Sequence, residues 1–89
     1  GRAGMAGGLA NHRRIEIIRL LQARGSLCVN DVAGECRIDV ATASQHAKRL
    51  HEAGLIKKRA RGRRVELFPT KRALTLLGTI DMLWDAPAD

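Results

Sequence analysis

Aromatic residues are almost missing from this sequence, which has one phenylalanine, one tryptophan and no tyrosine among its 89 residues. The core must therefore be built from Leu, Ile, Val and Ala, with Phe68 and Trp84 as its only aromatic members. Hydrophobic residues still reach 45%, which is typical of a globular chain and excludes a disordered one. The length suits one small domain, so any effector site must share its few helices.

Long hydrophobic runs are also missing. No apolar stretch approaches the roughly 20 residues that span a bilayer, and no signal-peptide core follows the start. We therefore expect a cytoplasmic protein, in which Cys28 and Cys36 are reduced thiols. The Gly-rich residues 1–8 have no pattern, and we interpret them as a disordered N-terminal segment or a cloning scar. Residues 9–84 then form the domain, and residues 85–89 form a flexible tail.

The motifs of common enzyme classes are not found either. The sequence shows no nucleophile and base in a suggestive setting, no phosphate-binding glycine motif and no ligand set for a catalytic metal. We therefore expect neither an enzyme nor a bound metal or cofactor.

Acidic residues are few, since nine Asp and Glu stand against sixteen Lys and Arg, giving a net charge of +7. Eight of the sixteen basic residues fall between Lys57 and Arg72, where Glu66 is the only acid. Such a concentration favours a polyanionic partner over a merely solvated surface.

The first half of the chain shows the periodicity of three helices. Apolar residues from Asn11, a good N-cap, to Gly25 predict a first helix, and residues 27–36 predict a short second helix. After a turn, Asp39 is placed to cap a third helix over residues 40–53, which ends at Gly54. The order is therefore helix, tight turn, helix.

The third helix has one apolar face and one polar face. Val40, Ala43, Ala47 and Leu50 fall within an arc of about 80°. Short or hydrogen-bonding side chains occupy the opposite face, namely Ala41, Ser44, Gln45, Lys48 and Glu52. These are the properties of a helix whose first turns enter a major groove.

Two short β-rich runs follow, residues 55–59 and 64–68, and read as a hairpin whose tip carries Arg61 and Arg63 around Gly62. Pro69 and Thr70 then begin a last helix that continues to about Trp84. We therefore predict a mainly α fold with a small β-hairpin, in the order α-α-α-β-β-α.

The first and last helices carry more apolar surface than one small core requires, with arcs of about 220° and about 180°. Burying the surplus across a two-fold axis predicts a homodimer. The residues expected at its interface are Ile15, Ile18, Leu21, Leu77, Ile80 and Trp84.

This order of elements, together with three short sequence motifs, resembles the ArsR/SmtB family of bacterial winged helix-turn-helix repressors over roughly residues 11–84. The resemblance rests on Ser-Leu-Cys-Val-Asn-Asp-Val-Ala at residues 26–33, on Ser44-Gln45-His46, and on Glu-Ala-Gly-Leu-Ile at residues 52–56. It implies a DNA-binding winged helix-turn-helix fold in a homodimeric repressor, although winged helices also serve other contacts.

By that resemblance, the DNA-reading positions fall on Thr42, Ser44, Gln45 and His46, with Lys48 and Arg49 nearby, and the wing contacts fall on Arg61 and Arg63. The face count from the residues agrees for Ser44, Gln45 and Lys48. His46 lies on the flank of the buried stripe, where a packed histidine is the alternative.

The chain departs from the family at its effector sites. The arsenic and cadmium sensors read Leu-Cys-Val-Cys-Asp where this chain has Asn30 as the fourth residue, so one thiolate is missing. The zinc and nickel sensors use Asp and His along the last helix, which here has Asp81 and Asp85 but no histidine. Cys36 reads as a core residue, whereas Cys28 is a candidate redox thiol, because the family places a sensing thiol there.

The leading function is a sequence-specific repressor that binds a palindromic operator in double-stranded DNA as a dimer. The alternatives are a DNA-binding protein of plasmid or replicon maintenance, and a winged-helix module that binds an acidic protein partner.

Overall fold

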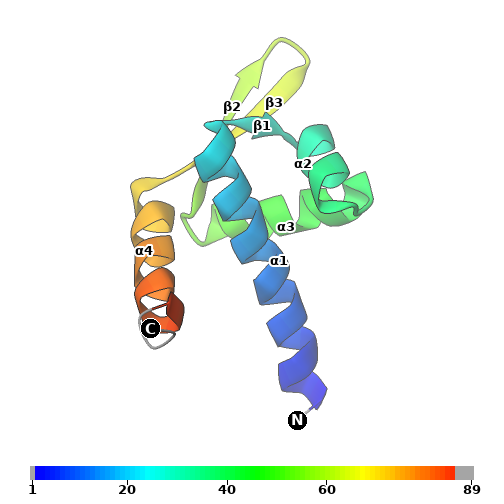
Figure 1. Ribbon diagram of the computed structural model, residues 1–89. Coiled ribbons are helices and arrows are strands. Elements are labelled where there is room, and N and C mark those ends of the chain that lie inside the picture. Colours follow the sequence, from blue (N-terminus) through cyan, green and yellow to red (C-terminus); the bar gives the residue numbers. More distant parts are fainter. Residues whose placement is uncertain (1, 86–89) are drawn as a thin grey trace.

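The computed structural model describes the backbone of residues 2–85 (Figure 1) and the side chains of residues 12–83. Its elements follow in the order α1 (Arg2–Arg24), β1 (Leu27–Cys28), α2 (Val29–Cys36), α3 (Val40–Glu52), β2 (Ile56–Arg61), β3 (Arg64–Pro69) and α4 (Lys71–Asp85). The predicted order α-α-α-β-β-α is confirmed, with the short strand β1 added to it. None of the helices described here combines the length and apolarity needed to cross a membrane.

Helix α1 is longer than the sequence predicted, because it begins at Arg2 rather than at Asn11. The Gly-rich segment that we interpreted as disordered or as a scar is therefore helical from residue 2 onward. Once a helix is nucleated, each added residue gains a backbone hydrogen bond, so a good N-cap residue does not by itself stop the growth. Of the predicted tail, Asp85 is the last residue of α4, and residues 86–89 lie outside the described part of the chain.

Strand β1 corrects a second prediction, since Leu27 and Cys28 were expected to open the second helix. Cys28 has extended dihedral angles, with φ −85° and ψ 166°, and α2 begins only at Val29. Leu27 pairs with Leu67 and Cys28 with Glu66 in an antiparallel ladder. Helical periodicity alone could not reveal this pairing, because it depends on a strand roughly 40 residues further along.

The helix-turn-helix unit forms as predicted. Arg37 adopts the left-handed conformation that ends α2, with φ 58°, and the Ile38 N–H donates to the Ala33 carbonyl. Asp39 caps α3, where its carboxylate accepts a hydrogen bond of 2.7 Å from the Thr42 N–H. Hydrogen bonding from Thr42, first through its side chain and then through its backbone N–H, lowers the pKa of Asp39.

The hairpin is also confirmed, with Gly62 at its tip in a positive-φ conformation of 61°. The sheet order is β1-β3-β2, so β3 lies in the centre of a three-stranded antiparallel sheet. Leu67 of β3 is fully buried, and β3 contacts α1. This contact joins the base of the hairpin, hereafter the wing, to the helices.

The core is aliphatic, as the shortage of aromatics predicted. Phe68 is only half-buried, so its expected place in the core is wrong, and the side chain of Trp84 lies outside the described residues. The buried residues come from every element except β1, and Leu27 of β1 packs against them. They are Ile17, Ile18, Leu21, Val32, Ala33, Cys36, Ala43, Ala47, Leu50, Ile56, Leu67, Ala73 and Leu77.

Thr70 joins the start of α4 to the end of the helix-turn-helix unit. Its hydroxyl donates to the Gly54 carbonyl at 2.7 Å and accepts a hydrogen bond of 3.2 Å from the Ala73 N–H. Its backbone N–H donates to the Leu55 carbonyl at 3.1 Å. One residue therefore caps α4 and holds it against the corner that leads into the wing.

Replacing Thr70 by Ala should lower the free energy of unfolding by about 1–2 kcal/mol, because it removes the cap and leaves part-buried backbone groups without partners. Urea denaturation followed by circular dichroism measures the loss. Thr70→Ser keeps the hydroxyl and should lose less than half as much. An equal loss in both variants would assign the effect to the methyl group instead.

Candidate nucleic-acid interface

The polar face of α3 is open to solvent along its first turns. Thr42, Ser44, Gln45 and Lys48 are all exposed, while Ala43, Ala47 and Leu50 on the opposite face are buried. Arg49 is exposed as well and lies toward the C-terminal end of the helix. The small residues Ala43 and Ala47 let the helix pack closely on the core, so that its outer side chains project from the surface.

His46 differs from the other expected DNA-reading residues because it is half-buried. Burial lowers the pKa of His46, and the positive charges of Arg14 and Arg13 on α1 lower it further. A neutral imidazole, half-buried near these arginines, is therefore the form that the structure favours at neutral pH. A DNA contact by His46 stays a prediction.

Most of the cations on the two strands of the wing lie on one face. Ile56 of β2 and Leu67 of β3 point into the core. Because side chains alternate along a strand, every second residue, starting from the neighbours of Ile56 and Leu67, points outward. The outward set, hereafter the outer face of the wing, consists of Lys57, Arg59, Arg61, Arg64, Glu66 and Phe68. Arg61 pairs directly with Arg64, and Arg59 pairs with Glu66, across the two strands. Arg63 is exposed in the tip itself.

Arg61 is held by an ion pair that the sequence did not predict. Its Nη1 donates to Glu66 Oε1 at 2.9 Å, and the Ser26 hydroxyl donates to Glu66 Oε2, also at 2.9 Å. The hydrogen bonds from Arg61 and Ser26 lower the pKa of Glu66. The alternation on either side of Gly62 could have shown that Arg61 and Arg64 share a face, but Ser26 reaches Glu66 only because β1 pairs with β3.

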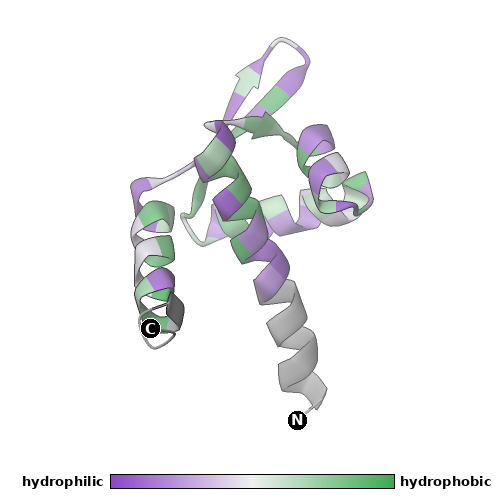
Figure 2. Ribbon diagram, in the orientation of Figure 1, coloured by the Kyte–Doolittle hydropathy of each residue, from purple (hydrophilic) through white to green (hydrophobic). Residues whose placement is uncertain are grey.

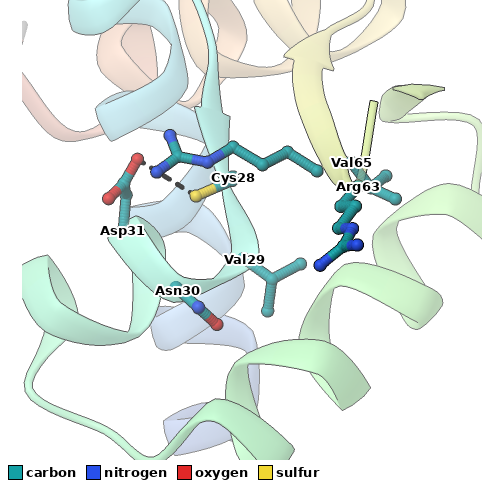
Figure 3. A pocket seen from close by; sticks show the side chains of 7 residues that line it. Cys28, Val29, Asn30, Asp31, Arg63 and Val65 are labelled. Carbon is teal, nitrogen blue, oxygen red and sulfur yellow. Dashed lines mark hydrogen bonds between the residues drawn. The ribbon is translucent and has the colours of Figure 1, made fainter. Parts of the chain in front are cut away.

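The two cysteines lie in different settings. Cys36 is buried in the core, as predicted. Burial raises the pKa of its thiol, and the negative charge of Glu16 raises it further. Cys28 is half-buried and lines a cavity between the wing and the start of α2, with Arg63 and Val65 on the wing side (Figure 3). Its Sγ donates to Asp31 Oδ2 at 3.1 Å. A redox role for Cys28 stays a prediction.

No group of three or more His, Cys, Asp and Glu side chains in the described part of the chain is placed to hold a metal ion. Both cysteines are free thiols.

The residues expected at a dimer interface do not all lie on the surface. Ile18, Leu21 and Leu77 are at most 1% exposed in the single chain, so they have almost no area left for a partner. The arc count was misleading because α1 packs against α2, α3, α4 and β3 within one chain. Placing these three residues at the interface was therefore wrong.

Exposed apolar surface does remain on α4, which is hydrophobic along much of its length (Figure 2). Leu76 is 38% and Leu83 69% exposed, and both lie on one side of the helix with the half-buried Ile80. Leu76 and Ile80 line a shallow apolar groove together with Ile15 of α1. We call Ile15, Leu76, Ile80 and Leu83 the α1–α4 surface. Trp84, also expected there, has its side chain outside the described residues.

The family model of "Bacterial regulatory protein, arsR family" matches residues 11–58, which is more than half of the chain. The chain belongs to this arsR family. The match runs from α1 through both helices of the helix-turn-helix unit into β2. It confirms the family that the sequence resembles, which is a family of bacterial regulatory proteins.

A curated relative is the cadmium resistance transcriptional regulatory protein CadC homolog of Staphylococcus aureus. It is 39% identical over 57 residues, which make up 64% of this arsR-family chain and 47% of the relative. This chain thus spans about half the length of that curated relative.

Two solved structures share the fold. The homodimeric winged helix-turn-helix DNA-binding domain of Mb0332 from Mycobacterium bovis is 28% identical, with a TM-score of 0.77 over 93% of this chain and 77% of that one. A cysteine-to-serine mutant of MarR from E. coli, solved in complex with operator DNA, has a TM-score of 0.77 over 81% of this chain and 54% of that one. At 11% identity, MarR shows the fold alone.

The lowered pKa of His46 predicts a pH-dependent stability. As the pH falls below about 6.5, the unfolded chain takes up a proton on this imidazole before the folded protein does, so the folded state loses stability. Asp39, Glu66 and Asp81 also have lowered pKa values, but their effect begins only near their ordinary values of 3.8 to 4.5.

Urea denaturation between about pH 7 and pH 5 measures this effect. The wild type should lose stability across that range, and His46→Gln, which does not titrate, should show a flatter dependence. The same slope in both proteins would contradict the assignment to His46.

Proposed function

We propose that this chain binds double-stranded DNA as a homodimer and acts as a sequence-specific repressor in the bacterial cytoplasm. The observation that carries the proposal is the exposed polar face of α3, with Ser44, Gln45 and Lys48 turned to solvent beside a wing rich in cations. Side chains of this kind at the start of a recognition helix suit base edges in a major groove, and wing cations suit the phosphates.

The mechanism follows from the symmetry of a dimer. Two recognition helices related by a two-fold axis would enter successive major grooves, so the operator would be an imperfect palindrome with half-sites about one helical turn apart. Occupation of such a site within a promoter would block transcription by steric exclusion. The arsR-family membership and the operator complex of MarR, which has the same fold, support this proposal.

Two variants distinguish base reading from phosphate contact. Each is tested on an operator selected from random DNA and on an unselected random duplex. Gln45→Ala should weaken binding to the selected operator by about 1–3 kcal/mol and change binding to random duplex little. Arg63→Ala should weaken both alike and lower the salt slope by about one unit. Fluorescence anisotropy at several salt concentrations measures both. Equal losses of Gln45→Ala on the two DNAs would remove its base-reading role.

The dimer is proposed to form through the α1–α4 surface. The apolar side chains of Ile15, Leu76, Ile80 and Leu83 lie on neighbouring parts of α1 and α4, and an exposed apolar surface on a small domain favours association. The Mb0332 domain, which has a similar fold, is homodimeric, and this supports a homodimer for this chain.

Leu83→Glu should convert the dimer into a folded monomer, because it places a charge in the interface. Met82, at 75% exposed, lies on a different side of α4 from Leu83, so Met82→Glu is the matched control and should remain dimeric. Sedimentation equilibrium measures the mass, and circular dichroism checks the fold. A monomeric wild type, or dissociation of both variants alike, would exclude this interface.

A further inference from the structure

The ion pair on the outer face of the wing joins an expected DNA contact to an acid that would repel DNA. Glu66 is the only acid between Lys57 and Arg72, and it is bonded to Arg61. The pairing is not forced by the hairpin, because the residue directly across from Glu66 is Arg59, and Arg61 lies across from Arg64. Arg61 has therefore turned along the strand toward the carboxylate.

The two partners of this pair are held very differently. The Glu66 side chain is 19% exposed, and its second oxygen accepts the 2.9 Å hydrogen bond from Ser26, which precedes β1. The Arg61 side chain is 73% exposed, and Glu66 is the acid with which it forms an ion pair within the described part of the chain. The acid is thus fixed in place, whereas the cation can exchange its partner at little cost.

We propose that Glu66 is a built-in counter-charge that occupies Arg61 in the free protein and competes with DNA phosphates for it. This inference rests on the proposed function. A phosphate oxygen competes with the carboxylate for the positive charge of Arg61, so part of the electrostatic gain is lost on every duplex, whatever its sequence. Glu66 thereby weakens non-specific binding through the wing, so that base reading by α3 weighs more in the choice of site.

The lowered pKa of Glu66 agrees with this role, since the carboxylate stays ionised and able to compete throughout the neutral range. Asp31 provides a matched control. It lines the same cavity as Arg61, Arg64 and Glu66, but its carboxylate accepts from the Cys28 thiol. Asp31→Asn removes an equal charge from the same place without releasing Arg61.

The experiment measures the dissociation constant for a mixed-sequence duplex at several salt concentrations. Glu66→Gln keeps the length of the side chain and can still bond Ser26, so it should fold and bind about two- to fivefold tighter at low salt. Asp31→Asn should gain less than Glu66→Gln. In the Arg61→Ala background, Glu66→Gln should gain no more than Asp31→Asn does, because the cation that it releases is missing and only the direct repulsion is removed.

Three outcomes would overturn the inference: unchanged binding by Glu66→Gln, weaker binding, or the same gain in the Arg61→Ala background. Weaker binding would mean that Glu66 positions Arg61 for DNA. Glu66→Asp provides a second variant, since it keeps the charge but cannot span Ser26 and Arg61 equally well, and its affinity should lie between those of wild type and Glu66→Gln. A wild type without salt-dependent duplex binding would contradict the proposed function itself, which separates the two failures.

Discussion

The packing of α1 in the interior is the constraint on which the rest of the structure depends. Ile17 and Leu21 are fully buried, and the helix contacts α2, α3, α4 and β3. Full burial of one such side chain stabilises a fold by about 1.5–3 kcal/mol. Because α3 and the central strand of the wing both pack against this helix, α1 sets the distance between α3 and the wing. The bidentate Arg19–Asp81 pair adds a surface link between α1 and α4.

Local signals predicted most of the fold, whereas long-range contacts escaped prediction. The cap at Asp39, the turn at Gly62 and the limits of α3 depend on neighbours a few residues away, so the sequence reveals them. Strand β1 exists only because β3 lies beside it, and Leu77 is buried within one chain, where α4 contacts α1 and β3. The exposed face of α3 was predictable from the helical period of about 3.6 residues, but the bond between Arg61 and Glu66 required the sheet.

Most acidic residues of the described part of the chain form contacts within the molecule. Glu16, Glu35, Glu66 and Asp81 each form an ion pair with an arginine, and Asp39 caps α3. Apart from the Glu66 side chain, the members of these pairs are exposed, and such exposed pairs contribute little to stability. Their larger effect is on the distribution of charge, because they neutralise arginines of α1 and leave Lys48 of α3 and most cations of the wing outside the ion pairs of the described residues.

The sheet order β1-β3-β2 leaves β2 as an edge strand, since β1 covers only the side of β3 opposite to it. An unpaired edge exposes backbone donors and acceptors to any other extended chain, which is a common route to aggregation. In β2 that edge reads Ile-Lys-Lys-Arg-Ala-Arg, and every residue after Ile56 is exposed. The same cations that suit a nucleic acid therefore repel a second copy of the strand, and they keep the wings of neighbouring molecules from joining into a continuous sheet.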